Sequence, residues 1–147
     1  MILNTTIRLA EPSDLSKIFE IEKQFGLDAF SKVTFKRQLG NSFFCILEVE
    51  GVFAGYYLGL TNSMWASVRL YSIAVDTVFQ GRGFGKLLLT DFTEKVRKRG
   101  YSYIKLEVAE HNPARHLYEK LGYKQVDTIE DYYADGSAAQ VMRLDLY

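Results

Sequence analysis

The stretch Gln80-Gly81-Arg82-Gly83-Phe84-Gly85 is the most informative part of this 147-residue chain. It lies between an apolar, strand-like run at residues 70–75 and a helix-like run at residues 86–99. Three glycines at alternate positions leave main-chain amides uncovered just where a helix begins. Unpaired N–H groups at the positive end of a helix dipole bind anions. The stretch therefore predicts a site for a phosphate or pyrophosphate group.

Two other glycine motifs bind phosphates, and neither fits this stretch. A Walker loop ends in Gly-Lys-Ser/Thr, but here Gly85-Lys86 is followed by Leu87, so the magnesium-binding hydroxyl is missing. A dinucleotide-binding motif needs a third glycine three positions beyond the second, where this chain has Lys86 or Leu88. The sequence thus argues against a kinase-type and against a dehydrogenase-type site.

The composition is that of one globular domain with one core, because 48% of the residues are hydrophobic and 24% are charged. We expect residues 1–147 to form this single domain. The 18 basic residues balance the 18 acidic ones, so no overall field attracts nucleic acid or an anionic membrane. No signal-peptide pattern opens the chain, and no run approaches the ~20 apolar residues of a membrane span. The cytoplasm is the expected compartment.

Cysteine and histidine indicate no metal or redox chemistry. Cys45 is the one cysteine, and its neighbours Phe43, Phe44, Ile46 and Leu47 favour a buried strand. His111 and His116 have no cysteine or carboxylate around them at metal-ligand spacing, so we expect no metal site.

The first half of the chain predicts two helices and three strands. A short strand at residues 7–9 precedes a helix that begins near Pro12 and carries an apolar stripe, interrupted by the charged Glu22. A second short helix is expected from Ser31, taken as its N-cap. Strand-like runs at residues 43–48 and 52–60 are joined by Glu50-Gly51, which indicates an antiparallel hairpin.

The second half predicts strands alternating with helices. A strand at residues 67–75 leads through the glycine stretch to a helix that Gly100 closes. Apolar and polar residues alternate at 103–108, so Glu107 should lie on the face opposite the apolar side chains. Asn112 and Pro113 are the expected N-cap and first residue of a helix ending near Leu121. With strands at 123–128 and 139–146, we expect an α/β fold with a mixed, mainly antiparallel sheet of six or seven strands and about four helices.

At this point a family resemblance appears. The pattern Gln/Arg-x-x-Gly-x-Gly/Ala at residues 80–85, preceded by Ile73-Ala74-Val75-Asp76, resembles the GCN5-related N-acetyltransferases. The likeness continues through Leu106-Glu107-Val108, Asn112-Pro113-Ala114, residues 117–123 and the segment from Tyr132-Tyr133 to Met142. These motifs are most similar to the bacterial ribosomal-protein alanine N-acetyltransferases. The likeness covers residues 70–146, while the first third fits only loosely.

The resemblance implies acetyl-coenzyme A as the cofactor, with no metal. Its pyrophosphate would be bound by the backbone of the glycine stretch, with Gln80 bracing the loop and Lys86 contributing its side chain. Asn112 would cap its helix and also touch the pantetheine arm. The implied cofactor-binding residues are Ile73, Ala74 and Val75, whose main-chain amides would run along the pantetheine and stabilise the oxyanion, and Gly81, Arg82, Gly83, Phe84, Gly85, Lys86 and Asn112.

The resemblance also implies two catalytic residues. Glu107 occupies the position of the general base that deprotonates the acceptor amine, and Tyr118 matches the tyrosine that gives its proton to the departing thiolate. Spacing alone would make Glu107 a solvated strand residue and Tyr118 a core aromatic. Direct transfer without a covalent enzyme intermediate follows from these roles.

The acceptor is less well defined by the sequence. Tyr132 and Tyr133 resemble the segment that binds the N-terminus of an acceptor protein, but Glu130-Asp131 and Ser137 depart from the family pattern. The expected activity is acetylation of a protein α-amino group, as a monomer or homodimer. Two alternatives stay open: a small-amine acetyltransferase acting on a polyamine or aminoglycoside, and a coenzyme A binding module without catalysis.

Overall fold

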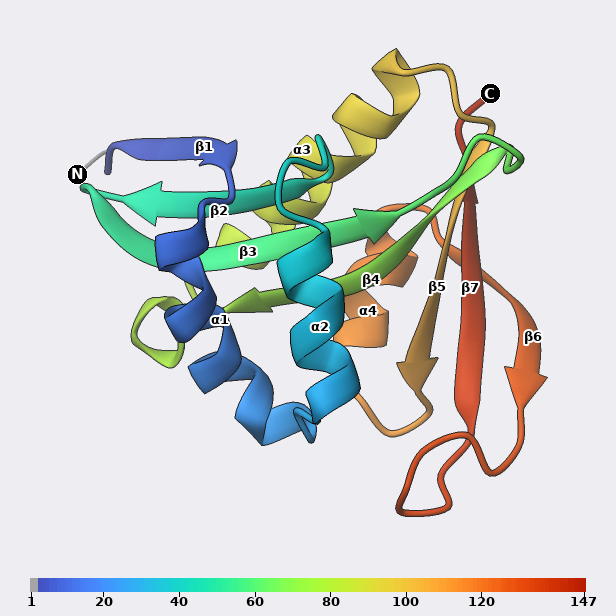
Figure 1. Ribbon diagram of the computed structural model, residues 1–147. Coiled ribbons are helices and arrows are strands. Elements are labelled where there is room, and N and C mark those ends of the chain that lie inside the picture. The colour runs from blue at the N-terminus through green and yellow to red at the C-terminus, as the bar shows by residue number, and fades with distance from the viewer. Residues whose placement is uncertain (1–2) are drawn as a thin grey trace. The chain divides into compact units, whose positions relative to one another are not determined.

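A computed structural model describes residues 3–147, which form seven β-strands, four α-helices and three short 3-10 helices (Figure 1). The strands are β1 (Thr5–Leu9), β2 (Phe44–Val49), β3 (Val52–Leu60), β4 (Ser67–Val75), β5 (Tyr103–Ala109), β6 (Lys124–Ile129) and β7 (Ala139–Asp145). The α-helices are α1 (Leu15–Glu22), α2 (Ala29–Arg37), α3 (Phe84–Lys98) and α4 (Ala114–Lys120). The 3-10 helices are η1 (Pro12–Asp14), η2 (Lys23–Phe25) and η3 (Thr77–Phe79).

The seven strands form one sheet in the order β1-β2-β3-β4-β5-β7-β6. The pairs β1–β2, β2–β3, β5–β7 and β6–β7 are antiparallel, and β4 pairs with β5 in parallel. The expected α/β class, the mixed and mainly antiparallel sheet, and the number of helices are confirmed. No helix within residues 3–147 is both long and apolar enough to cross a membrane.

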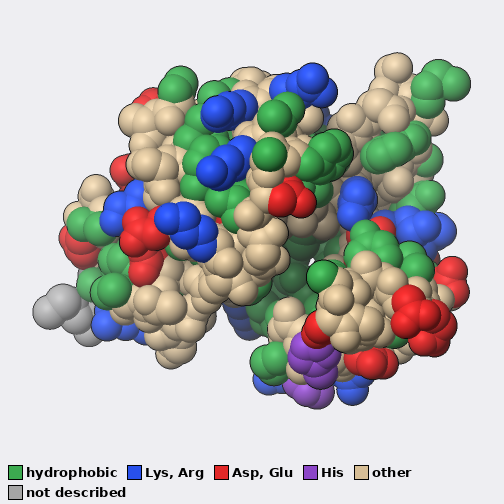
Figure 2. Space-filling view, turned by 60° about the horizontal axis from the view of Figure 1, so that its bottom comes forward, with side chains coloured by type: hydrophobic (Ala, Val, Ile, Leu, Met, Phe, Trp, Pro, Cys, Tyr) green, Lys and Arg blue, Asp and Glu red, His purple; other side chains and the backbone are tan. Residues whose placement is uncertain are grey.

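Backbone contacts group the described chain into two compact units. Unit 1 comprises residues 3–59 and 72–92, and unit 2 comprises residues 60–71 and 93–147. Strand β4 therefore begins in unit 2 and ends in unit 1. Lysine, arginine, aspartate and glutamate side chains are interspersed over the face seen in Figure 2.

Unit 1 is built on the predicted β2–β3 hairpin. Glu50 and Gly51 both have positive φ, +51° and +77°, which is the backbone of a tight two-residue hairpin turn. Helix α2 packs Phe35 into the core, where its ring lies 5.9 Å from that of Phe44 and 6.2 Å from that of Tyr56. Cys45 in β2 is fully buried, as expected.

The charged Glu22 interrupts the apolar stripe of α1 because it serves a polar contact. The hydroxyls of Tyr56 and Ser72 both donate to its Oε1. Burial and the neighbouring carboxylate raise the pKa of Tyr56, so this hydroxyl keeps its proton and remains a donor. Glu22 thus connects α1 to β3 and to the part of β4 that belongs to unit 1.

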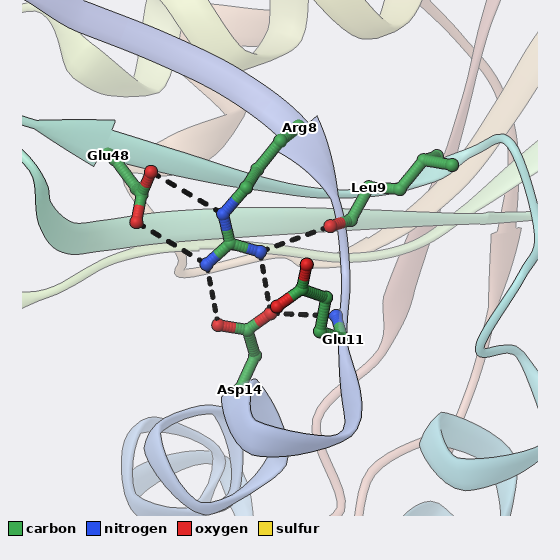
Figure 3. Close-up of polar contacts among 5 residues, drawn as sticks. All are labelled: Arg8, Leu9, Glu11, Asp14 and Glu48. Carbon is green, nitrogen blue, oxygen red and sulfur yellow. Dashed lines mark hydrogen bonds and ion pairs between the residues drawn. The ribbon is translucent and has the colours of Figure 1, made fainter.

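A second group of polar contacts joins β1 to η1 (Figure 3). Arg8 donates from Nη1 and Nη2 to the two carboxylate oxygens of Asp14 at 2.8 and 2.9 Å, and the main-chain N–H of Glu11 donates to Asp14 at 2.7 Å. Although burial opposes ionisation, these hydrogen bonds hold the pKa of Asp14 below its usual value. Asp14 is therefore a buried, ionised residue that fixes the entry into α1.

Two helix starts differ from the prediction in unit 1. Helix α2 begins at Ala29, and its N-cap is Asp28, whose carboxylate accepts from the N–H of Ser31 at 2.7 Å; the prediction of Ser31 as N-cap is wrong. Asp28 has the extended conformation that an N-cap needs, whereas Ser31 lies inside the helix. Helix α3 begins at Phe84 and so absorbs the end of the glycine stretch.

Unit 2 shows the predicted alternation along β5. Ile104, Leu106 and Val108 are buried, whereas Lys105 is exposed and Glu107 is part-exposed on the other face. Helix α4 begins at Ala114, one residue later than predicted, because Pro113 takes the N-cap position.

Candidate active site

The glycine stretch in unit 1 has the backbone that an anion site requires. Gly81 and Gly83 have φ of +79° and +85°, a conformation that L side chains rarely adopt. Among the described residues, the main-chain N–H groups from Gly81 to Lys86 make no hydrogen bond, and the first regular bond of the turn is Leu87 N–H to Gly83 O at 3.1 Å. Six consecutive amide donors are therefore available at the N-terminal end of α3.

Gln80 holds the start of this loop. Its side-chain Nε2 donates to the carbonyl oxygen of Val75 at 3.0 Å, which ties the loop to the end of β4. Arg82 and Lys86 are exposed beside the free amides. The loop thus carries two exposed cationic side chains and six N–H groups without a partner among the described residues.

The end of β4 runs unusually close to β3. A Cβ built on Gly55 would lie 2.6 Å from the carbonyl oxygen of Ala74 and 3.3 Å from the Cα of Val75. Only glycine allows this approach, so Gly55 determines where the backbone of Ile73-Ala74-Val75 lies. The sequence interpretation missed Gly55, although a glycine inside an apolar strand is the expected signal for a close backbone approach.

In unit 2, the carboxylate of Glu107 is paired with an arginine. Arg69 on β4 donates from Nε to Glu107 Oε2 at 2.9 Å, and its Nη2 lies 3.5 Å from the hydroxyl of Tyr132. Glu107 is about one-fifth exposed at its side chain, so it reaches solvent while the arginine orients it. Arg69 is the principal residue that the sequence analysis missed, because it is 38 positions away from its partner.

Tyr132 and Tyr133 lie in the loop between β6 and β7. Their main-chain N–H groups both donate to the carbonyl of Ser137 at 3.1 Å, and their rings meet edge to face at 4.9 Å. Burial raises the pKa of Tyr133, and the nearby Tyr132 and Glu107 raise it further. The structure therefore places Tyr133 near Glu107, and Tyr132 beside Tyr133 and Arg69.

Tyr118 is buried in unit 2, 8% exposed, with its ring 5.7 Å from that of Tyr123 in an edge-to-face contact. Burial, assisted by Tyr133, raises the pKa of Tyr118 to about 12. Its hydroxyl is therefore protonated at neutral pH, as a proton donor must be. Tyr133 is the neighbour that Tyr118 and Glu107 share.

Asn112 precedes α4 and keeps part of its predicted capping role. Its Oδ1 accepts from the N–H of Ala114 at 2.9 Å, although Pro113 is the formal N-cap. The side-chain NH2 of Asn112 makes no hydrogen bond within residues 3–147 and remains a donor for a ligand.

Histidine, cysteine, aspartate and glutamate do not gather into a group of three that could hold a metal, as far as the described residues go. His111 and His116 are exposed, and purple side chains are visible at the surface in Figure 2.

A pocket of about 390 Å³ lies beside Glu107 in unit 2. Met64, Trp65, Arg69, Tyr103 and Lys105 contribute to its lining. Glu130 and Asp131, which depart from the family pattern, are exposed and do not line the pocket. The pocket therefore combines two aromatic side chains with two cations and one carboxylate.

Comparisons with known proteins agree on one family. The family described as "Acetyltransferase (GNAT) domain" matches residues 10–146. A ribosomal protein bS18 alanine N-acetyltransferase from Haemophilus influenzae is 33% identical over 131 residues, 88% of each chain. The crystal structure of the ribosomal-protein-S18-alanine N-acetyltransferase from Escherichia coli is 29% identical, with a TM-score of 0.83 over 97% of this chain and 94% of that one.

The fold is also shared by yncA from Salmonella typhimurium, whose structure was determined with its cofactor acetyl-CoA. That protein is 20% identical, with a TM-score of 0.79 over 97% of this chain and 94% of the other. At this identity the likeness concerns the fold alone.

Proposed function

The chain belongs to the GNAT acetyltransferase family, and from this premise we propose that it transfers the acetyl group of acetyl-coenzyme A to a protein N-terminal α-amino group. That it is an N-acetyltransferase follows from the family. The finer assignment is supported by relatives that act on an alanine of a ribosomal protein. We further propose that residues 1–147 act as one catalytic domain.

The observation that carries the cofactor assignment is the row of six unpaired amides from Gly81 to Lys86. A pyrophosphate has enough acceptor oxygens to use several of them, and the start of α3 adds its positive dipole. The side chains of Arg82 and Lys86 add positive charge, while Phe84, which is 8% exposed, anchors the loop in the core. The loop residues thus have a common task, which is to bind the diphosphate.

The backbone of Ile73-Ala74-Val75 is assigned to the pantetheine and the acetyl group. An amide near Val75 would stabilise the carbonyl oxygen as it gains negative charge. Gly55 supports this role, since it allows the β4 backbone to lie where it does. Asn112 would donate its free side-chain NH2 to the pantetheine arm.

Glu107 is assigned as the general base and Tyr118 as the general acid. Glu107 accepts a proton from the α-ammonium group, directly or through water, which frees the nitrogen lone pair to attack the thioester carbon. The carbon–sulfur bond then breaks, and Tyr118 gives its proton to the thiolate. Arg69 positions Glu107 for this transfer through the 2.9 Å contact, and Tyr132 and Tyr133 border the acceptor amine.

A small polycationic amine is disfavoured as the acceptor by the charge of the pocket. Arg69 and Lys105 contribute two positive charges there, against one negative charge from Glu107. A polyamine would therefore meet repulsion beside the base. A coenzyme A binding module without catalysis would bind the cofactor but release no thiol, so turnover distinguishes it. The presence of Glu107 and Tyr118, which are proposed for the two proton transfers, argues against this alternative.

The test is thiol release from acetyl-coenzyme A with a panel of peptides that differ in their first residue, and with polyamines and aminoglycosides in parallel. Mass spectrometry of the products locates the acetyl group. The proposal expects acetylation of the peptide α-amine. Acetylation of small amines or lysine side chains alone would overturn it, and cofactor binding without turnover on any acceptor would favour the non-catalytic module.

A further inference from the structure

The pocket beside Glu107 contains more positive charge than the fold requires. Arg69 and Lys105 are register partners on the parallel pair β4–β5, Lys105 is the partner of Arg143 on β7, and Arg143 is the partner of Lys124 on β6. Register partners share one face of a sheet, and like charges directly opposite each other are destabilising. Four cations therefore form a row across unit 2, at a cost in stability.

Carboxylates on the same face neutralise this row only in part. Glu107 pairs with Arg69, and Asp145 accepts from Arg143 Nε at 2.8 Å. Asp127 lies in the next row, opposite Val141. Lys105 is exposed, has a cation on either side, and makes no ion pair or hydrogen bond within the described residues. The side chain of Lys124, at the outer end of the row, likewise makes no ion pair or hydrogen bond within residues 3–147, but of these two cations only Lys105 lines the pocket.

Apolar side chains border Lys105 in the same pocket. Trp65 is 47% exposed and Met64 is 89% exposed, although both are large hydrophobic residues. The Arg143 guanidinium lies over the ring of Tyr103 at 3.7 Å, so that ring is held flat beneath a cation. An exposed aromatic next to an unbalanced cation is suited to a peptide that carries a negative charge among apolar groups.

We propose that Lys105, with Arg69 and Arg143 on either side, binds an acidic side chain of the acceptor polypeptide just behind its N-terminus, while Trp65 and Met64 cover the adjoining residue. This rests on the proposed function, because it places the acceptor amine at Glu107. The ligand class is thus a protein N-terminus with an early aspartate or glutamate.

The spacing along β5 limits where that acidic residue stands. Lys105 and Glu107 are two positions apart on one strand, so their Cα atoms are separated by roughly 6.6 Å at about 3.3 Å per residue. An extended acceptor covers this distance in about two residues. Because the side chains of Lys105 and Glu107 are long, they can reach acceptor residues on either side of this spacing. The acidic residue is therefore expected at position 2, 3 or 4 of the acceptor.

The experiment uses three alanine-initiated peptides that differ only at position 3, with glutamate, glutamine or lysine. Two readouts are recorded on the full-length enzyme: kcat/KM from thiol release, and the intrinsic fluorescence of Trp65, the one tryptophan of the chain. The glutamate peptide should exceed the glutamine peptide about threefold to fivefold in kcat/KM, with the lysine peptide lowest. Raising the salt should reduce this preference.

Lys105→Glu should invert the order of the three peptides, whereas the matched control Lys98→Glu, at the exposed end of α3, should preserve it. Unchanged order in Lys105→Glu, with peptides still acetylated, would overturn the pocket assignment and leave the proposed function standing. Saturable, Lys105-dependent fluorescence changes without acetylation would overturn the proposed function instead. Absence of both signals would overturn the two together.

Discussion

The glycine loop of unit 1 and the Arg69–Glu107 pair of unit 2 differ in the groups that they offer to a ligand: main-chain amides in the loop and charged side chains in the pair. The role proposed for the loop depends on main-chain amides, and these belong to one continuous run of six residues. The pair works through side chains from β4 and β5, and its members are 38 positions apart. A backbone site can be located from local sequence, while a side-chain site depends on which strands become neighbours.

Removing the base is expected to have the largest effect. Glu107→Gln keeps the shape of the side chain but cannot accept the proton, so kcat should fall about 10²-fold to 10⁴-fold. The affinity for acetyl-coenzyme A, measured by calorimetry, should stay within about twofold, because Glu107 is not among the residues proposed to bind the cofactor. Glu110→Gln, an exposed glutamate just beyond β5, is the control and should retain activity. Full turnover in Glu107→Gln would remove Glu107 from the mechanism.

Removing the proton donor should have the next largest effect. Tyr118→Phe preserves the buried ring but lacks the hydroxyl, so kcat should fall by about 10²-fold, at the lower end of general acid catalysis. Pre-steady-state measurement of thiol release separates this step from product release. Equal rates in the variant and the wild type would show that the thiolate leaves without help from Tyr118.

Strain in the glycine loop should weaken cofactor binding but leave the rate of acetyl transfer largely unchanged. Gly83→Ala forces an L side chain to φ +85°, which costs about 1–2 kcal/mol or displaces the amides. The Kd for acetyl-coenzyme A should rise about tenfold, with kcat at saturating cofactor largely retained. Gly40→Ala, at φ +94° with equally open space around it, imposes similar strain elsewhere in unit 1. If Gly83→Ala and Gly40→Ala weakened cofactor binding equally, the loss would be a general effect of backbone strain and would not assign the cofactor to the glycine loop.

The smallest expected effect concerns alkaline stability. Burial raises the pKa of Tyr118 to about 12, above the value near 10 in the unfolded chain. The neutral hydroxyl is therefore favoured by folding, and its contribution is complete below pH 10 and lost as the pH rises toward 12. In urea unfolding, wild type should lose more stability than Tyr118→Phe over this interval. Parallel curves for the two proteins would contradict the burial of this hydroxyl.

Local patterns predicted most of the architecture. The alternation along β5 placed Glu107 on the polar face, and Glu50-Gly51 predicted the β2–β3 turn, because both depend on neighbours in sequence. Helix starts were harder to place: Asp28 and Ser31 are both good N-caps, and only the structure shows that Asp28 is extended and accepts from the N–H of Ser31.

Long-range pairing was not accessible from the sequence. In the sequence, nothing distinguishes Arg69 from any other arginine of an exposed strand. Only the parallel register of β4 with β5 shows that it lies next to Glu107. The row of four cations likewise exists only once β4, β5, β7 and β6 are placed side by side. The proposed acceptor preference, which depends on this row, could therefore be inferred only from the structure.

The central claim is that the free amides from Gly81 to Lys86 bind the diphosphate of coenzyme A. Amide NMR spectra recorded during a titration with coenzyme A, and separately with dephosphorylated pantetheine, test it directly. If the loop binds the diphosphate, the NMR signals of these six amides should shift strongly and saturably with coenzyme A, and only slightly with pantetheine. Tight binding of coenzyme A that leaves the six amides unshifted would contradict it.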